Sequence, residues 1–268
     1  MTSALRQKLI AVKDSGRKIL SFFITAGYPH PDDTVAIVRS LAEGGADLVE
    51  LGIPFSDPIA DGPVIQASSE QAIKNGGSLA RTLELAAEIR KSVAIPIVLM
   101  GYANPIVRFG MDKFFAACAT VGVEGTIIPD VPLEESGEYR ELAGRCGIAT
   151  VFLAAPTSSD ERIAILDQAS QGFLYCVSVA GVTGAREGLA EQAADFLRRA
   201  RGIVTCNPLL VGFGIAAPDD AVRLSKFSDG VIVGSSLLRR IGSSPRGAAA
   251  QEAGRFARDF RAALDRCP

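Results

Sequence analysis

The feature that most constrains the fold is an alternation of short apolar runs with longer amphipathic segments, repeated along the whole chain. Most of the short runs are continuously apolar rather than alternating, which is typical of strands covered on both faces of a parallel sheet. Eight of them have the length and composition of strands, at 19–26, 46–52, 95–101, 125–130, 148–155, 172–179, 209–214 and 229–234. The pattern therefore predicts a parallel α/β fold.

Helices are predicted between these strands, and one more precedes the first strand. Amphipathic periodicity places them at 32–45, 78–92, 111–122, 133–147, 159–170, 189–201, 218–227 and about 246–265. Eight strands separated by helices, without a linker, predict a single-domain (β/α)8 TIM barrel over residues 1–268 with an extra N-terminal helix. An open doubly wound sheet is the alternative, but it usually has fewer strands and often a glycine-rich first turn.

Composition limits the classes of function. Of 268 residues, 48% are hydrophobic and 22% charged, so a large core is expected. The net charge is -2 and the basic residues are scattered, which argues against a nucleic-acid or membrane partner. No apolar stretch approaches about 20 residues and the N-terminus lacks a signal-peptide pattern, so we expect a soluble, cytoplasmic protein.

A metal site and a Schiff-base lysine are both argued against by the positions of the cysteines, the histidine and the lysines. Five cysteines without a CxxC pair and a single histidine, His30, predict reduced thiols and no metal site. The seven lysines all lie in predicted helices or before strands. None stands at the carboxyl end of a strand, where a Schiff-base aldolase would need its nucleophile. Acid–base chemistry without a metal remains.

The sequence VELGIPFSDPIADG, at 49–62, concentrates carboxylates at the end of the second predicted strand. Barrel active sites are built at the carboxyl ends of strands. Glu50 lies in an apolar run, so desolvation should raise the pKa of its carboxyl and suit it to both taking and giving a proton. Asp57 and Asp61 are also compatible with an ordinary solvated loop, and Asp130, after the fourth strand, with a structural role.

Two glycine-containing turns predict a phosphate site, GFG at 212–214 and VGSS at 233–236. In barrels the loops after the seventh and eighth strands commonly bind phosphate through backbone N–H groups and a short helix. Tight turns without a ligand are the alternative. An apolar end of the same pocket is predicted from side chains at strand ends, namely Phe23, Met100, Ile127, Leu153 and Phe213.

Taken together, these segments closely resemble the tryptophan synthase alpha chain family. Besides VELGIPFSDPIADG, the matching segments are FITAGYP (23–29), GYANPI (101–106), IIPDVPLEES (127–136), LYCVSVAGVTG (174–184), LVGFGI (210–215) and DGVIVGSSL (229–237). The resemblance covers essentially the whole chain in the same order. It implies retro-aldol cleavage of indole-3-glycerol phosphate to indole and glyceraldehyde 3-phosphate, with no metal or organic cofactor.

The resemblance also implies a role for each matching residue. Glu50 matches the acid–base that protonates indole C3 and then removes a proton from the glycerol hydroxyl. Asp61 matches the aspartate that hydrogen-bonds to the indole N–H, and Thr183 a residue of the lid that closes over the site. The remaining implied substrate contacts are Phe23, Met100, Ile127, Leu153 and Phe213 around the indole, Tyr175, and Gly184, Phe213, Gly214, Gly234 and Ser235 at the phosphate.

Members of this family normally work with a pyridoxal phosphate-dependent beta chain in an αββα complex. Pro54, Asp57, Pro58 and Asn104 match its partner-facing segments, and pyridoxal phosphate would belong to the beta chain. The same residues are compatible with a stand-alone lyase that releases free indole. A catalytically silent barrel that acts only as an allosteric partner is a further alternative, although the presence of Glu50, Asp61 and Thr183 argues against it.

Overall fold

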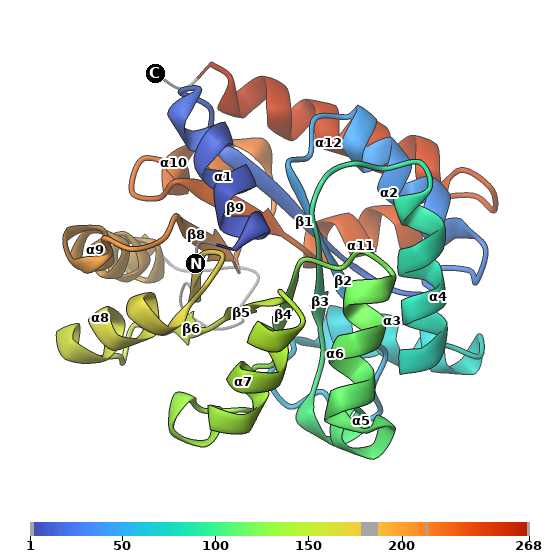
Figure 1. Cartoon of the computed structure of the whole chain (residues 1–268). Helices are drawn as coiled ribbons and strands as arrows, with labels where there is room; N and C mark the ends of the chain where they lie inside the picture. Colours follow the sequence, from blue (N-terminus) through green and yellow to red (C-terminus); the bar gives the residue numbers. More distant parts are fainter. Residues whose placement is uncertain (1–2, 178–186, 213, 267–268) are drawn as a thin grey trace.

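A parallel sheet closed into a barrel forms the centre of the computed structural model, which describes residues 3–177, 187–212 and 214–266 (Figure 1). Its strands lie in the order β5-β4-β3-β2-β1-β9-β8-β7-β6. Seven of them correspond to single predicted strands, β1 (Ile19–Thr25), β2 (Leu48–Gly52), β3 (Ile97–Met100), β4 (Gly125–Ile127), β7 (Leu174–Val177), β8 (Leu209–Gly212) and β9 (Gly230–Val233). The prediction of a TIM barrel is confirmed.

The fifth predicted strand is divided at Phe152 into β5 (Ala149–Val151) and β6 (Leu153–Ala154). β5 pairs with β4, whereas β6 pairs with β7. Because the two halves are consecutive in the chain, they join the two edges of the sheet and close the ring. The break also explains why the described sheet has one strand more than the sequence predicts.

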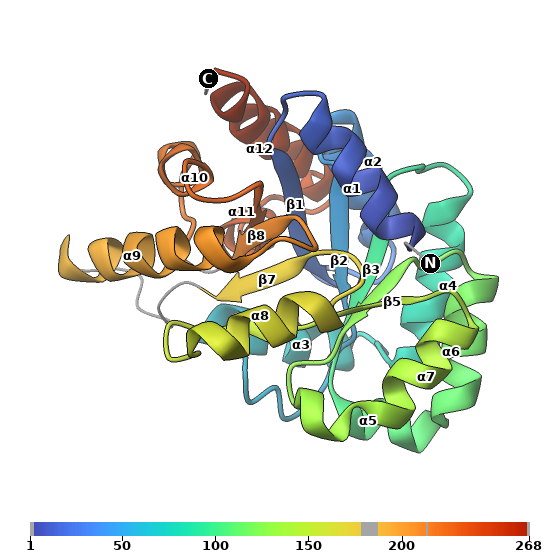
Figure 2. The same ribbon diagram turned by 60° about the vertical axis from the view of Figure 1, so that its left-hand side comes forward.

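Helices surround the barrel, and Figure 2 shows α8 and α9 beside β7 and β8. They are α1 (Ala4–Asp14), α2 (Asp33–Glu43), α3 (Pro63–Lys74), α4 (Leu79–Arg90), α5 (Ala103–Phe109), α6 (Met111–Thr120), α7 (Gly137–Arg145), α8 (Asp160–Ala169), α9 (Glu187–Ile203), α10 (Pro218–Ser225), α11 (Ser235–Gly242) and α12 (Ala249–Leu264), with a 3-10 turn at Leu133–Glu135. Polar caps begin several of them. The Ser3, Ser78 and Ser159 hydroxyls each accept a backbone N–H of the first turn.

Besides the eight-residue α11, the predicted helices leave out two others, α3 and α5. The buried face of α3 consists of Ser68, Ser69 and Ala72, so it carries no stripe of large apolar residues. Its start does have a signal, since Pro63 is its first residue. α5 has only seven residues, too few for a helical period to stand out. α3 directly follows the loop that carries Asp57 and Asp61.

α1 covers the amino-terminal end of the barrel (Figure 1). Leu5 is fully buried there, in space left by glycines, since a Cβ on Gly172 would lie 2.5 Å from a methyl group of Leu5. Lys8 and Lys13 form ion pairs with Glu124 and Asp229, which directly precede β4 and β9. The carboxyl end of the barrel is therefore the end left for a site.

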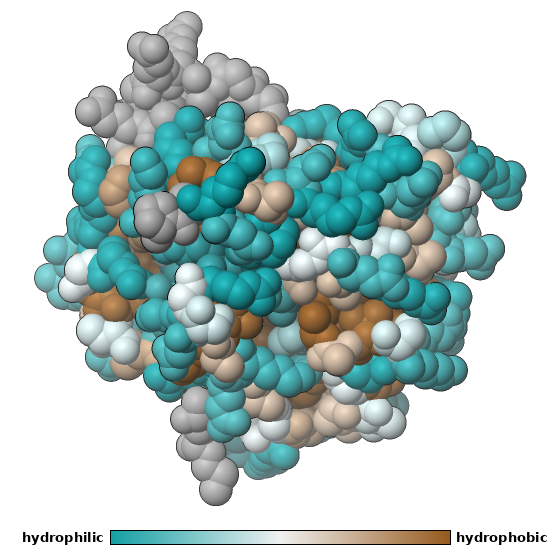
Figure 3. Space-filling model, turned by 90° about the horizontal axis from the view of Figure 1, so that it is seen from above, coloured by the Kyte–Doolittle hydropathy of each residue, from teal (hydrophilic) through white to brown (hydrophobic). Residues whose placement is uncertain are grey.

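The outer surface is mainly polar. On the face seen in Figure 3 hydrophilic residues predominate, and hydrophobic ones form small groups between them. Within the described ranges, no helix has the length and apolar character that crossing a membrane requires.

Candidate active site

Glu50 is the third residue of β2 and is fully buried. It pairs with Phe23 of β1 on one side and Val98 of β3 on the other. The Ser21 hydroxyl donates to Glu50 Oε1 at 3.5 Å, while Oε2 finds no hydrogen-bond partner among the described residues. Burial raises the pKa of Glu50 to about 8 against a small lowering by Ser21. At neutral pH this carboxyl is mostly protonated.

Asp61 is half-buried in the loop between β2 and α3. Its Oδ2 accepts the O–H of Tyr102 at 2.9 Å. Its Oδ1 is buried and has no hydrogen-bond partner in the described part of the chain. Burial raises the pKa of Asp61 to about 6, and the Tyr102 hydrogen bond acts in the opposite direction. At pH 7 Asp61 is therefore mostly ionised, in contrast to Glu50.

Tyr175 of β7 lies within electrostatic range of both carboxyls. Burial raises its pKa, and the charges of Glu50 and Asp61 raise it further. Its hydroxyl packs against the backbone of Gly212, where a Cβ would lie 2.1 Å from the oxygen. Only glycine leaves room for the tyrosine at this point of β8. The structure thus brings together three of the predicted site residues from three separate strands or loops.

A narrow cavity lies at the carboxyl ends of β1, β2 and β3. Of the predicted residues, Phe23, Met100 and Asp61 line it. The other lining residues are Thr25, Gly52, Ile53, Pro58, Ile65, Ser69, Gly101 and Tyr102. Ile127 and Leu153 lie on β4 and β6, outside this set. The cavity therefore has an apolar wall and, at Asp61 and Tyr102, a polar one.

Ile65 and Ser69 of the lining are not predicted from the sequence, because they come from α3, which has no clear helical pattern. Tyr102 can be selected from the sequence, since it follows β3 at the strand end where barrel sites are built, but the sequence gives it no role.

The two glycine-containing turns lie next to each other, as a shared phosphate site requires. Gly234 immediately precedes α11, and Ser235 is the first residue of that helix. Gly214 has a φ of +75°, in the region that favours glycine. The Ser236 hydroxyl donates to the Ile215 carbonyl at 2.9 Å and so ties the two turns together rather than serving as a free donor. Thr183, Gly184 and Phe213 lie outside the described residues.

The four residues expected at a partner interface differ in exposure. Asp57 and Asn104 are exposed, whereas Pro54 and Pro58 are buried within this chain. Pro58 also lines the cavity. Two exposed apolar side chains lie near Asp57 and Asn104 in the sequence, Ile59 at 81% and Val107 at 61% exposure.

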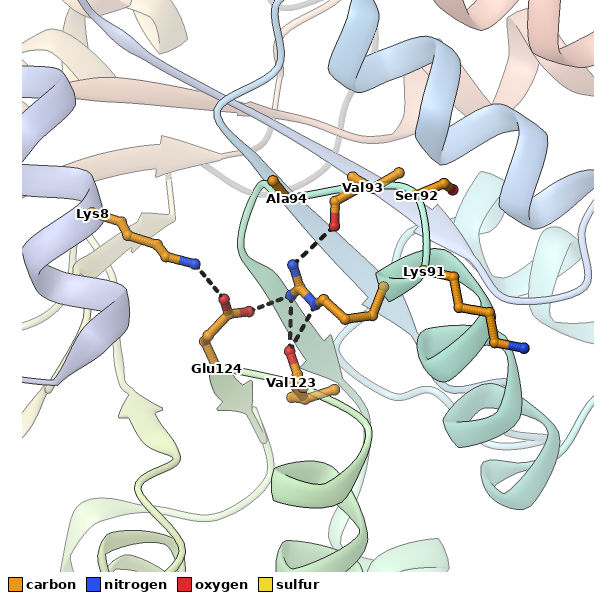
Figure 4. Close-up of a pocket in the computed structure, with 9 residues that line it drawn as sticks. Lys8, Lys91, Ser92, Val93, Ala94, Val123 and Glu124 are labelled. Carbon is orange, nitrogen blue, oxygen red and sulfur yellow. Dashed lines mark hydrogen bonds and ion pairs between the residues drawn. The ribbon is translucent and has the colours of Figure 1, made fainter.

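A wider cavity lies at the opposite end of the barrel, lined by residues that include Lys8, Arg90 and Glu124 (Figure 4). The Arg90 guanidinium donates to the carbonyls of Gly122, Val93 and Ile95 and to Glu124. All its nitrogens are thus engaged in holding the loops that precede β3 and β4. Barrel active sites lie at the other end, so we interpret this cavity as structural.

No group of three or more His, Cys, Asp or Glu residues in the described ranges could hold a metal ion. The cysteines that the structure describes, Cys118, Cys146, Cys176 and Cys206, are free thiols.

Comparison with known proteins gives consistent matches over nearly the whole chain. A family model described as tryptophan synthase alpha chain matches residues 9–264. The chain is 45% identical over 249 residues to the tryptophan synthase alpha chain of Dehalococcoides mccartyi, covering 93% of this chain and 96% of that protein. It is 46% identical over 224 residues to that of Geotalea daltonii, covering 84% of each. The crystal structure of tryptophan synthase subunit alpha from Legionella pneumophila superposes with a TM-score of 0.90 at 35% identity, covering 99% of both chains.

Proposed function

Because the chain belongs to the tryptophan synthase alpha chain family, we propose that Glu50 and Asp61 divide the proton chemistry of the reaction that this family catalyses. That reaction is the cleavage of indole-3-glycerol phosphate, a lyase step in tryptophan biosynthesis. One observation carries the proposal. The two carboxyls have raised pKa values that lie on opposite sides of neutral pH, about 8 for Glu50 and about 6 for Asp61. Such a pair can supply a proton donor, Glu50, together with a negative charge, Asp61.

In the first step, protonated Glu50 gives its proton to indole C3, and the ring becomes a cation with its charge centred on nitrogen. The ionised Asp61 stabilises this cation by accepting the indole N–H, for which its buried Oδ1 is available. Glu50, now a carboxylate, then removes the proton of the glycerol hydroxyl. The C–C bond breaks, its electron pair returns to the ring, and indole and glyceraldehyde 3-phosphate are formed. Glu50 ends the cycle protonated, as it began.

The substrate is proposed to lie with its indole toward the apolar wall and its phosphate toward the two glycine-containing turns. Phe23 and Met100 line the cavity on the indole side, and Ile127, Leu153 and Phe213 are assigned to the same end. At the phosphate end, backbone N–H groups near Gly184, Phe213, Gly214, Gly234 and Ser235 are the proposed donors, helped by the N-terminus of α11. Thr183 is assigned to the lid and Tyr175 to a substrate contact.

We further propose that the chain acts as one barrel domain in the cytoplasm and assembles with a beta chain as αββα. The exposed residues Asp57, Ile59, Asn104 and Val107 form the proposed contact surface. Pyridoxal phosphate is assigned to the beta chain, because the proton transfers proposed here need only carboxyl groups.

The test is an assay of indole release with Glu50→Gln and Asp61→Asn. We expect Glu50→Gln to abolish cleavage while calorimetry still detects binding of indole-3-glycerol phosphate, because the amide keeps the shape but cannot transfer the proton. Asp61→Asn should reduce turnover by about a hundredfold or more, as loss of a transition-state charge partner typically does. Glu138→Gln, on the exposed surface of α7, is the matched control. Near-normal turnover of Glu50→Gln would show the acid–base assignment to be wrong.

A further inference from the structure

Tyr102 connects the loop after β2 with the loop after β3. Its side chain is buried, and its hydroxyl makes two hydrogen bonds to consecutive residues. It donates to Asp61 Oδ2 at 2.9 Å and accepts the backbone N–H of Ala60 at 3.1 Å. Because a phenol has a single proton, acceptance from Ala60 leaves that proton for the carboxyl.

The backbone next to Tyr102 is held independently of the loop that its hydroxyl binds. Tyr102 directly precedes α5, and the N–H of the first helical residue, Ala103, lies 3.0 and 3.2 Å from the two carboxylate oxygens of Asp130. A carboxylate at a helix N-terminus is a stabilising cap. The Tyr102 ring also packs against the Phe55 ring, with centroids 5.5 Å apart. Asp130, whose role the sequence leaves open, thus fixes the backbone that carries Tyr102.

The loop around Asp61 has few other ties to the rest of the barrel. At its start, the backbone of Phe55 exchanges hydrogen bonds with the Ser69 hydroxyl. At its end, Gln66 of α3 donates to the Asp61 carbonyl at 2.9 Å. Neither contact touches the Asp61 carboxyl, whose orientation is set by the Tyr102 hydroxyl.

We propose that Tyr102 is a positioning residue of the active site, which occupies Oδ2 of Asp61 and leaves Oδ1 as the oxygen that receives the substrate. The inference rests on the function proposed above for Asp61. It adds a residue that does not itself exchange a proton with the substrate. Without the tyrosine hydroxyl, the carboxyl would be free to rotate and either oxygen, or neither, would face the indole N–H.

The same hydrogen bond favours the ionised form of Asp61. The titratable groups that interact with this carboxyl are Tyr102 from the β3–α5 loop and Tyr175 from β7. Glu50 also acts on Tyr175, and Asp130 also acts on Tyr102. The Tyr102 O–H lowers the pKa of Asp61 against the effect of burial. Loss of the hydroxyl should therefore move the Asp61 pKa upward, whereas Glu50, which is hydrogen-bonded to Ser21, should keep its own.

The experiment is a pH profile of kcat for Tyr102→Phe. We expect kcat at neutral pH to fall about tenfold, with a smaller change in KM, because a hydrogen bond to a charged group is lost. The acid limb of the profile should move up by about half a pH unit or more. Tyr139→Phe is the matched control, since Tyr139 is buried and hydrogen-bonded to Thr126 Oγ1 at 2.7 Å, away from the cavity lining. It should lose a similar amount of stability without moving the acid limb.

A double-mutant cycle separates this inference from the proposed function. If Asp61→Asn retains turnover, the proposed role of Asp61 fails whatever Tyr102 does. If Asp61→Asn loses turnover, Tyr102→Phe should cause little further loss in that background. An unchanged acid limb in Tyr102→Phe, or equal losses with and without Asp61, would overturn the positioning role and leave the proposed function standing. The melting temperature of each variant shows whether it is folded.

Discussion

Burial of the Glu50 carboxyl should cost the protein stability at high pH. The pKa of Glu50 is about 8 in the folded chain and 4.5 for an ordinary glutamate. Between these two values the folded state retains a proton that the unfolded state has released. The free energy of unfolding therefore falls as pH rises through this window, from almost no cost below pH 4.5 to the full cost above pH 8.

Glu50→Gln should remove this pH dependence, because the amide has no proton to lose. At about 1.4 kcal/mol for each pH unit, the full cost is about 5 kcal/mol, and about 4 kcal/mol of it appears between pH 5 and pH 9. Solvent does not screen the charge of Glu50, since this side chain is fully buried. Any fixed cost of burying the amide is the same at each pH, so it cancels in this difference.

Urea denaturation followed by circular dichroism, at pH 5, 7 and 9, measures the effect. The stability of Glu50→Gln relative to the original chain should rise by about 4 kcal/mol from pH 5 to pH 9. Glu138→Gln, on an exposed carboxyl, should show no such rise. A change below about 1 kcal/mol would refute the argument that desolvation raises the Glu50 pKa. A positive result would mean that the chain gives up stability to keep a buried carboxyl protonated.

Three other measurements test the structure and the proposed activity. Leu5→Ala should lower the free energy of unfolding by about 2–5 kcal/mol, since it empties the space between α1 and Gly172. The control Ile165→Ala, on an exposed side chain, should change it by no more than about 0.5 kcal/mol. Equal effects of the two substitutions would contradict the packing of α1. Gly212→Ala should lower the free energy of unfolding by about 1–3 kcal/mol, because its methyl group would clash with the Tyr175 hydroxyl. Adding Tyr175→Leu to this variant should restore part of the lost stability. Thermal melts that show no such rescue would count against this contact. Indole release should persist in EDTA and rise strongly when a beta chain is added. Inhibition by EDTA would bring back a metal mechanism, and equal turnover with and without the partner would favour a stand-alone lyase.

The sequence by itself determined the barrel and singled out Glu50 as a candidate acid–base. Continuous apolar runs can be read as buried parallel strands because both faces of such strands are covered, and the structure places a strand at each of them. Glu50 could be selected because an acid inside an apolar strand carries a desolvation cost that is already visible in the sequence. The paired glycine-containing turns after the seventh and eighth predicted strands are likewise a local pattern.

Only the tertiary structure decided which side chains meet. Tyr102 and Asp61 are 41 positions apart, so their hydrogen bond exists only once the loops after β2 and β3 lie side by side. Pro58 is buried in the cavity lining for the same reason, since its neighbours there come from other elements. The closure of the sheet at Phe152 depends on β5 and β6 pairing with different strands. Local composition specifies periodicity and desolvation, whereas such contacts between distant segments follow from how the whole ring closes.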